Sequence, residues 1–417
     1  MAYTLGVVLF ALGILISIAI HEAGHMYSAR AFGMKVTQYF IGFGPTLWSF
    51  RKGETEYGVK PIPAGAFVKI VGMTPLEDEE EVAPADKHRV FWRKPLWQRT
   101  IVLSAGSISH FILGFLILWF TAAFVGVNNP AYAQAIEQAP KTTKVDIQDC
   151  VIVENVRREC RKSDPAAPAA RAGLKDGDVI TSVAGTSVSS YDDLVKAIRA
   201  TPPGETKLTY LRGDASHEVT VSLHPVQRQL SEDSKKLSTI AALGVSTYVD
   251  PAIPTTVTYG PVESIAVAGD YIGRMFVGTF QALAKFPEKV PKLFDALMGA
   301  ERDPETPISV VGASRLGGEI VEYEVWPLFF LLLAVLNLFV GVFNLFPLLP
   351  LDGGHIAIAW FERARTVIYG WIGRPDPGRV DYMKLMPLTY VVIIIFGLFT
   401  LLTVATDIVN PIQLFAR

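Results

Sequence analysis

Near its start the chain reads Leu5-Gly-Val-Val-Leu-Phe-Ala-Leu-Gly-Ile-Leu-Ile-Ser-Ile-Ala-Ile20, followed at once by His21-Glu22-Ala23-Gly24-His25. The stretch before His21 carries no charge, and its length and composition predict a helix. On a helix, His21 and His25 share one face and can bind one Zn²⁺, while Glu22 is placed to act as a general base. The motif is therefore either accidental or a hydrolytic centre at membrane depth.

The composition favours a membrane protein with more than one domain. The chain has 417 residues, 50% of them hydrophobic, which is too apolar for an ordinary soluble protein. A net charge of −2 implies neither nucleic acid nor an acidic substrate as a partner. The first residues lack the positive charge of a secretory signal peptide, so we expect a retained helix.

Three further segments reach membrane length: Ile101–Val127, Trp326–Leu351 and Met386–Val404. Because about 20 apolar residues span a bilayer core, the sequence predicts four transmembrane helices. The expected fold class is a polytopic α-helical membrane protein with a membrane-associated β-hairpin or sheet and an extracytoplasmic α+β domain. The predicted parts are the first helix with the HExxH motif, 1–35; a β-element and cytoplasmic loop, 36–98; the second helix, 99–127; an extracytoplasmic region, 128–325; the third helix, 326–356; a cytoplasmic loop, 357–385; the fourth helix, 386–406; and a tail, 407–417.

Lysine and arginine gather in the two short loops, which predicts that both are cytoplasmic and that both termini are extracytoplasmic. This orientation places His21 and His25 toward the cytoplasmic half of the membrane. The charges that decide it are Lys35, Arg51, Lys52, Lys60, Lys69, Lys87, Arg89, Arg93, Lys94 and Arg99 in the first loop, and Arg363, Arg365, Arg374, Arg379 and Lys384 in the second.

The first loop contains two stretches rich in aromatic and β-branched residues, Tyr39–Phe50 and Tyr57–Val71, separated by a charged turn. They predict a β-hairpin over about 40–71. Its prolines and glycines suit the edge of a sheet.

The extracytoplasmic region divides into two parts. Over about 148–226, short strands alternate with turns around a short helix, Tyr191–Arg199; the predicted strands are Val151–Val156, Asp178–Val183, Lys207–Leu211 and Glu218–Leu223. Over about 262–286, apolar residues recur at helical spacing. That helix either packs on a soluble core or rests on the membrane surface.

The only two cysteines, Cys150 and Cys160, both fall in this region. Outside the cytoplasm they can form a disulfide, and the alternative is two free thiols. Neither is available for a cysteine-based zinc site.

A candidate for the third zinc ligand, which would bind through oxygen, lies at the end of the third membrane segment. The sequence there is Asn344-Leu-Phe-Pro-Leu-Leu-Pro-Leu-Asp-Gly-Gly-His355. Pro347 and Pro350 break the helix there, and the two glycines allow unusual backbone angles. An irregular backbone and a carboxylate at membrane depth indicate a functional site. Two histidines and Asp352 would leave zinc an open position, which is the catalytic arrangement.

The HEAGH motif, the glycine-rich β-element, one PDZ-like domain and the N-x-x-P…L-D-G motif together resemble the site-2 protease family of intramembrane zinc metalloproteases. The chain is most similar to the bacterial subgroup that cleaves anti-sigma factors, in a single-PDZ form like the actinobacterial members. The resemblance covers essentially the whole chain. The PDZ signature is matched by Ala170-Arg-Ala-Gly-Leu-Lys-Asp-Gly-Asp178.

The resemblance implies a site, one residue at a time. His21, His25 and Asp352 match the ligands of one zinc ion per chain, Glu22 the catalytic base, and Asn344 a residue that steadies the substrate backbone. One departure concerns the start of the second membrane helix, where the family often has A-G-P-x-x-N and this chain has Ala105-Gly-Ser-Ile-Ser-His110. We expect His110 to be a hydrogen-bonded core histidine, with a role near the zinc as the alternative, and His355 to have a supporting role near Asp352.

Three classes of function follow. The first is an intramembrane endopeptidase that cuts single-pass membrane proteins, such as anti-sigma factors, after a first extracytoplasmic cleavage. The others are a non-catalytic membrane scaffold with a PDZ module and a metal transporter, although polar residues are too few on the first and fourth helices for transport. The expected partners are these substrates and the lipid bilayer of a bacterial inner membrane, with the protein itself a monomer.

Overall fold

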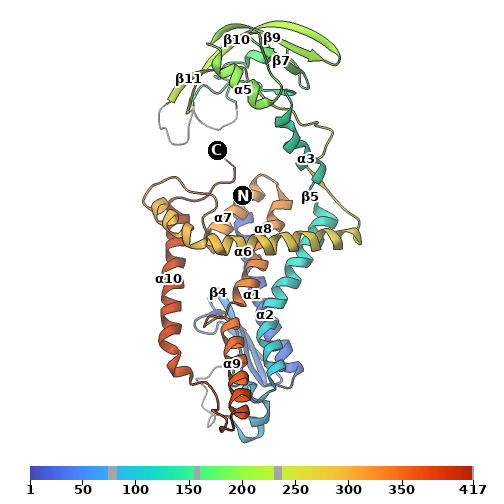
Figure 1. Cartoon of the computed structure of the whole chain (residues 1–417). Coiled ribbons are helices and arrows are strands. Elements are labelled where there is room, and N and C mark those ends of the chain that lie inside the picture. The colour runs from blue at the N-terminus through green and yellow to red at the C-terminus, as the bar shows by residue number, and fades with distance from the viewer. Residues whose placement is uncertain (74–81, 155–159, 230–236, 416–417) are drawn as a thin grey trace. The chain divides into compact units, whose positions relative to one another are not determined.

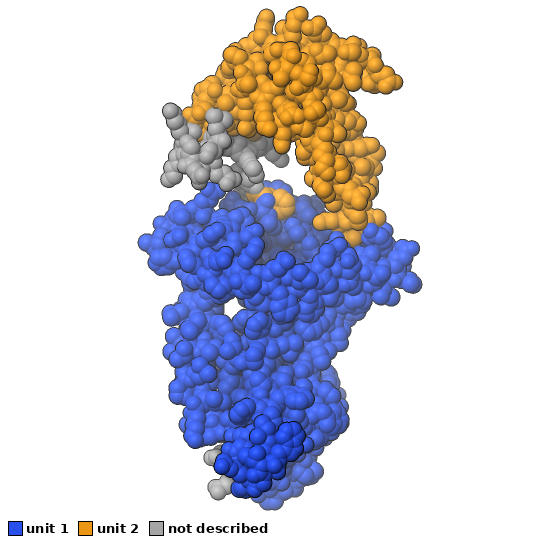
Figure 2. Space-filling view, viewed as in Figure 1, with its two compact units in different colours: residues 1–125, 258–414 blue, residues 126–257, 415–417 orange. Residues whose placement is uncertain are grey.

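The computed structural model describes residues 1–73, 82–154, 160–229 and 237–415. The chain forms two compact units: unit 1 comprises residues 1–125 and 258–414, and unit 2 comprises residues 126–257 with the last residues of the chain. Figure 1 traces the elements and Figure 2 colours the two units separately.

Four helices in the described part of unit 1 are long and apolar enough to cross a membrane, in agreement with the predicted number. They are α1 (Ala2–Ala31), α2 (Leu96–Phe120), α8 (Trp326–Asn344) and α10 (Met386–Val409). The helical path of α2 continues through a π-helical turn, η4 (Thr121–Val125). The protein is therefore an integral membrane protein.

Helix α7 (Val310–Glu322), which the sequence analysis did not predict, packs along α1 through glycines. A Cβ on Gly6 of α1 would lie 2.6 Å from the carbonyl oxygen of Gly317, and one on Gly317 would lie 2.6 Å from the Cβ of Phe10. Such distances are too short for any side chain. Small residues thus let the two backbones approach closely, as is common between membrane helices.

The β-element predicted as a hairpin or sheet is a four-stranded sheet. Its strands are β1 (Val36–Phe43), β2 (Trp48–Lys52), β3 (Thr55–Val59) and β4 (Ile62–Ile70), in the order β2-β3-β1-β4. Each of the two predicted stretches is split, the first at Gly44, which has a φ of 103°, and the second at Pro61. Strand β1 pairs in parallel with β3 and antiparallel with β4. Strand β4 is therefore an edge strand, and it packs against α1.

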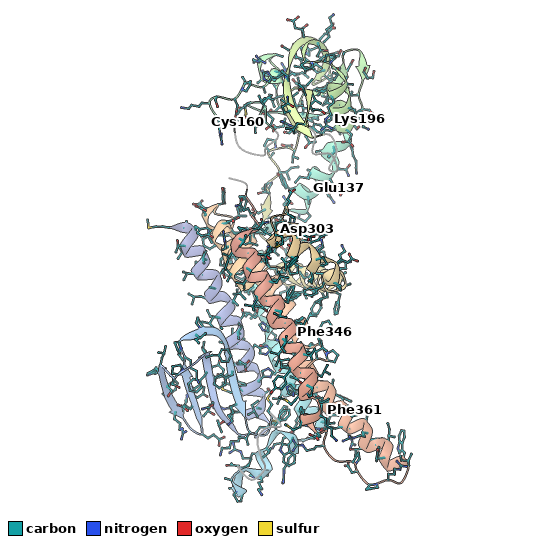
Figure 3. All side chains as sticks on the ribbon, turned by 90° about the vertical axis from the view of Figure 1, so that its left-hand side faces the viewer. Glu137, Cys160, Lys196, Asp303, Phe346 and Phe361 are labelled. Carbon is teal, nitrogen blue, oxygen red and sulfur yellow. A yellow bond between two sulfur atoms is a disulfide. The ribbon has the colours of Figure 1, made fainter. Side chains whose placement is uncertain are left out.

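The third membrane segment is broken where its prolines predicted. Helix α8 ends at Asn344, and a new helix, α9 (Asp352–Trp371), begins at Asp352. In Figure 3, Phe346 marks the connection and Phe361 lies in α9. The cytoplasmic loop predicted for 357–385 is thus largely helical, because α9 buries Ala359 and packs on α2 despite its charged residues.

Helix α6 (Glu263–Leu297) is longer than the 262–286 predicted, since Pro287 and Pro291 lie inside it rather than ending it. It packs against α2, α8 and α10, and in Figure 1 it runs crosswise to the membrane helices. Large apolar side chains remain exposed on it, including Ile265 and Phe280. Within unit 1 the helix therefore packs on membrane helices, while part of its apolar surface stays uncovered.

Unit 2 contains a five-stranded sheet in the order β11-β10-β9-β7-β8. One helix, α5 (Tyr191–Ala200), is capped by Ser190 and buries Leu194 against Ile180 and Leu208 of the sheet. The strands are β7 (Val179–Val183), β8 (Thr186–Ser187), β9 (Gly204–Arg212), β10 (Ala215–Gln229) and β11 (Leu237–Ala242). Smaller elements are β5 (Val127–Asn128), β6 (Val145–Ile147), β12 (Val245–Thr247), β13 (Thr256–Val257), α3 (Pro130–Gln138) and α4 (Pro168–Arg171).

Two expectations for unit 2 need comment. The strand predicted at Val151–Val156 is not formed over residues 151–154, and its last two residues lie outside the described part. Residues 152–154 instead offer their carbonyl oxygens to the guanidinium of Arg228. Cys150 and Cys160, for which both alternatives were open, are joined by a disulfide with an S–S distance of 2.01 Å.

Candidate metal centre

Helix α1 presents His21 and His25 on one face, one turn apart, as the HExxH spacing predicts. Their Nε2 atoms are 3.1 Å apart and both side chains are buried. The Nδ1 atom of His25 lies 2.7 Å from the carbonyl oxygen of Val102 on α2, so the Nε2 atom keeps the lone pair that binds a metal. Neighbouring α2 thus fixes the orientation of this ring.

Asp352 joins the two histidines from the other end of the sequence. Its Oδ2 atom is 3.3 Å from the Nε2 atom of each. The chain can turn back here because Gly353 and Gly354 have no side chains: a Cβ on Gly353 would lie 2.2 Å from the carbonyl oxygen of Leu345. The double glycine therefore brings the first residue of α9 to α1.

These three residues fit a zinc ion. The three potential ligand atoms all lie within 4.8 Å of one another, and they are the two nitrogens and one oxygen typical of a catalytic zinc site. The Oδ2 atom of Asp352 is buried and has no hydrogen-bond donor within the described residues. On α2, Gly106 leaves the space open, because a Cβ there would lie 2.5 Å from the ring of His21 and from Nε2 of His25.

A sequence model of peptidase family M50 matches residues 9–370. The chain belongs to peptidase family M50. The zinc metalloprotease Rip1 of Mycolicibacterium smegmatis is 41% identical over the full length of both proteins, and Rip1 of Mycobacterium tuberculosis is 40% identical over the same extent. Protease RseP of Yersinia pestis is 28% identical, covering 87% of this chain and 91% of that protein.

The similarity to the site-2 protease family is thereby confirmed, and this member of family M50 is a zinc metalloprotease. Zinc is its cofactor. Membership of a family of zinc metalloproteases excludes the non-catalytic scaffold and the metal transporter as alternatives. The family assignment does not by itself give the role of any single residue, which depends on the geometry.

Glu22 is a residue of α1 and lies on the side of that helix that faces the sheet. Its carboxylate lies near the backbone of Val68 on edge strand β4. On β1, the hydroxyl of Tyr39 donates to the carbonyl oxygen of Ala19, one turn before Glu22, at 2.7 Å. The candidate base therefore lies near edge strand β4, and the sheet that contains this strand is hydrogen-bonded to α1, the helix that carries the base.

Asn344 is the last residue of α8 and is half-buried. Its side chain forms no hydrogen bond with any residue that the structure describes. The prediction that it steadies the substrate backbone stays a prediction.

His110 is a hydrogen-bonded core histidine that also lies beside His21. It is buried on α2 and its Nδ1 atom lies 2.9 Å from Oδ1 of Asn337 on α8, as expected of a core histidine. Its ring is also 5.0 Å from the ring of His21, centroid to centroid. His355, one turn along α9 from Asp352, stacks on Tyr382 with the ring centroids 6.1 Å apart.

The sequence analysis missed two participants, Gly106 and Asn337. Gly106 lies in the Ala105-Gly-Ser-Ile-Ser-His110 stretch, in which only the departures from the family pattern drew attention, and Gly106 is not one of them. Asn337 is a polar residue within a strongly apolar segment, and that isolation was a usable signal.

Proposed function

We propose that this metalloprotease is an intramembrane endopeptidase that cleaves the transmembrane segment of single-pass membrane proteins, such as anti-sigma factors, after a first extracytoplasmic cut. One observation carries the proposal. His21, His25 and Glu22 lie on α1, a helix apolar enough to cross a membrane, and Asp352 at the start of α9 completes the cluster with the two histidines. A peptide bond that reaches this cluster does so within or next to the bilayer.

His21, His25 and Asp352 would hold the zinc ion through two imidazole nitrogens and a carboxylate oxygen. When bound, zinc supplies Lewis-acid polarisation of the scissile carbonyl and lowers the pKa of water to about 7. Glu22 takes the proton from the attacking water and passes it to the departing amide nitrogen. Asn344, at the end of α8, donates to the substrate backbone and holds it in place.

A helical substrate must unwind before cleavage, because its peptide bonds are hidden in helical hydrogen bonds. Strand β4 is an edge strand that packs on α1, and the backbone of its Val68 lies near Glu22. An extended substrate segment can pair with such an edge. Strand addition at β4 would present the scissile bond to Glu22.

The charge distribution supports an orientation in the bacterial inner membrane with the metal centre toward the cytoplasm and unit 2 outside. The disulfide of unit 2 agrees with an oxidising compartment. We assign the part of unit 2 over about 148–226 as the PDZ-like domain. A groove of about 430 Å³ between α5 and the β11 end, lined by Leu194, Ile198 and Leu243, is suited to binding an extended chain end.

The Glu22→Gln variant tests the central proposal. The amide cannot take a proton from water, so we expect cleavage of a single-pass reporter in detergent to fall to background while zinc content stays at one ion per chain. The matched control is Glu137→Gln, which makes the same exchange at an exposed position of unit 2 (Figure 3) and should cleave normally. Undiminished cleavage by Glu22→Gln would refute the mechanism.

The Val68→Pro variant tests strand addition. Proline removes a backbone N–H from edge strand β4 and disturbs strand pairing there, so cleavage of the reporter should slow while zinc content is unchanged. A peptide substrate that needs no unwinding is the control. If the two substrates are cleaved at unaltered rates, strand addition at β4 is wrong.

A further inference from the structure

One ligand of the proposed metal centre lacks its supporting contact. A histidine that binds a metal through one ring nitrogen nearly always donates the other N–H to a carbonyl, carboxylate or water, which fixes the ring. His25 does so through Val102 at 2.7 Å. The Nδ1 atom of His21 is buried, and the described residues offer it no partner.

Asn337 determines which nitrogen of His110 carries hydrogen. The Nδ2 atom of Asn337 donates to the carbonyl oxygen of Leu333 at 2.8 Å, so its Oδ1 atom is the acceptor that faces Nδ1 of His110 at 2.9 Å. His110 must therefore donate through Nδ1. In the neutral ring the lone pair is then on Nε2.

The lone pair of His110 is near the unsupported ring. The two ring centroids are 5.0 Å apart with the planes tilted by 45°. His110 also lies four residues after Gly106, on the same face of α2, and Gly106 directly adjoins the rings of both His21 and His25. Two imidazole rings at this centroid distance can bring one nitrogen of each within hydrogen-bonding range, so Nε2 of His110 can supply the partner that Nδ1 of His21 lacks.

Ser107 is the rival acceptor. It lies on the same helix one turn before His110, and its hydroxyl oxygen is buried without a partner in the described part of the chain. A hydroxyl rotates freely and therefore fixes a ring less well than an imidazole that is itself held by Asn337.

We infer that His110 is a positioning residue of the metal centre: its Nε2 atom accepts the hydrogen bond from the Nδ1–H of His21, and Asn337 holds it in the tautomer that can accept. The inference rests on the ligand set of the proposed function. If His110 acts in this way, replacing it lowers zinc affinity through His21. A histidine that only fills space in the core would have no such effect.

The test measures zinc affinity of the purified full-length protein in detergent, by competition with a chelator, and the visible spectrum of the cobalt-substituted form. His110→Leu removes the acceptor and should weaken zinc binding about 10- to 100-fold and alter the cobalt spectrum. His110→Gln keeps an acceptor and should recover most of that affinity. Thr121→Val is the control, because it removes a buried hydroxyl at the other end of the same membrane segment.

Zinc affinity and a cobalt spectrum unchanged in His110→Leu would overturn the inference. So would a loss that appears in Ser107→Ala instead, or an equal loss in His110→Leu, His110→Gln and Thr121→Val, which would indicate general packing. Should His110→Leu fail to fold, the His110→Gln and Asn337→Leu variants decide the question, since only the second should weaken zinc binding markedly. His21→Ala and Asp352→Ala test the ligand set separately: if they retain stoichiometric zinc, the proposed ligands are wrong.

Discussion

Helices α1 and α10 have the same mean hydropathy, 2.5, over their most apolar stretches, yet 22% of that stretch is buried in α1 and only 6% in α10. The difference lies in residues that hydropathy does not weigh. Cβ atoms on Gly6 and Gly24 of α1 would collide with neighbouring backbones at 2.6 Å, whereas one on Gly397 of α10 would meet nothing within 4 Å. Apolar composition decides that a helix enters the membrane, and small residues decide what it packs against.

Helix α10 is instead held near one end by charge. Asp407 accepts hydrogen bonds from Arg302 at 2.9 Å and from the backbone N–H of Ser309 at 2.6 Å. The side chains of Arg302 and Asp407 are only 4% and 1% exposed. One helix is thus fixed along its length by close packing and the other at its end by a buried ion pair.

The strongest test of this contrast is Gly106→Ala, on the helix that packs against α1. Its methyl group would enter the space between His21 and His25. Losing a residue that only supports a metal ligand weakens metal binding by up to roughly 100-fold, and we expect zinc affinity to fall by more than that here. Chelator competition measures the loss. Near-normal zinc binding would mean that α1 and α2 can separate, and that packing does not define the site.

A second test concerns the anchor of α10. Asp407→Ala leaves the Arg302 charge buried without its partner and should lower the free energy of unfolding by about 3–5 kcal/mol. The double variant Arg302→Leu/Asp407→Leu should recover much of this stability. Thermal unfolding in detergent provides the comparison, and equal melting temperatures for the single and double variants would argue against the ion pair as the anchor.

The smallest effects compare two glycines directly. Gly6→Ala places a methyl group against α7 and should destabilise the protein by about 1–3 kcal/mol. Gly397→Ala meets open space and should be neutral, or stabilising by up to about 1 kcal/mol because alanine favours a helix. If both variants behaved alike, the packing difference between α1 and α10 would have no energetic consequence.

Local signals predicted most of the candidate site. His21, Glu22 and His25 follow from helical periodicity, and Asp352 from the prolines and glycines that break the third membrane segment. Those patterns involve only residues close together in the chain. The structure brings the three potential ligands together, as the patterns predicted.

Non-local contacts explain what was missed. The parallel pairing of β1 with β3 has no signature in either strand alone. Helix α7 was not predicted within the region expected to be extracytoplasmic. Its glycines allow close packing against α1, and this contact cannot be seen from the sequence of α7 alone. Likewise, the proximity of His110 to His21 depends on how α2 packs, which the sequence of α2 does not reveal.

The arrangement of the metal centre has a consequence for the life of the protein in the cell. Two of the proposed ligands lie on α1 and the third on α9, so a single ion joins helices from opposite ends of the sequence. A ligand that binds only the folded state stabilises that state in proportion to its supply. Zinc shortage should therefore hasten degradation of the protease as well as stop its chemistry, and protein abundance itself would report the metal status of the membrane.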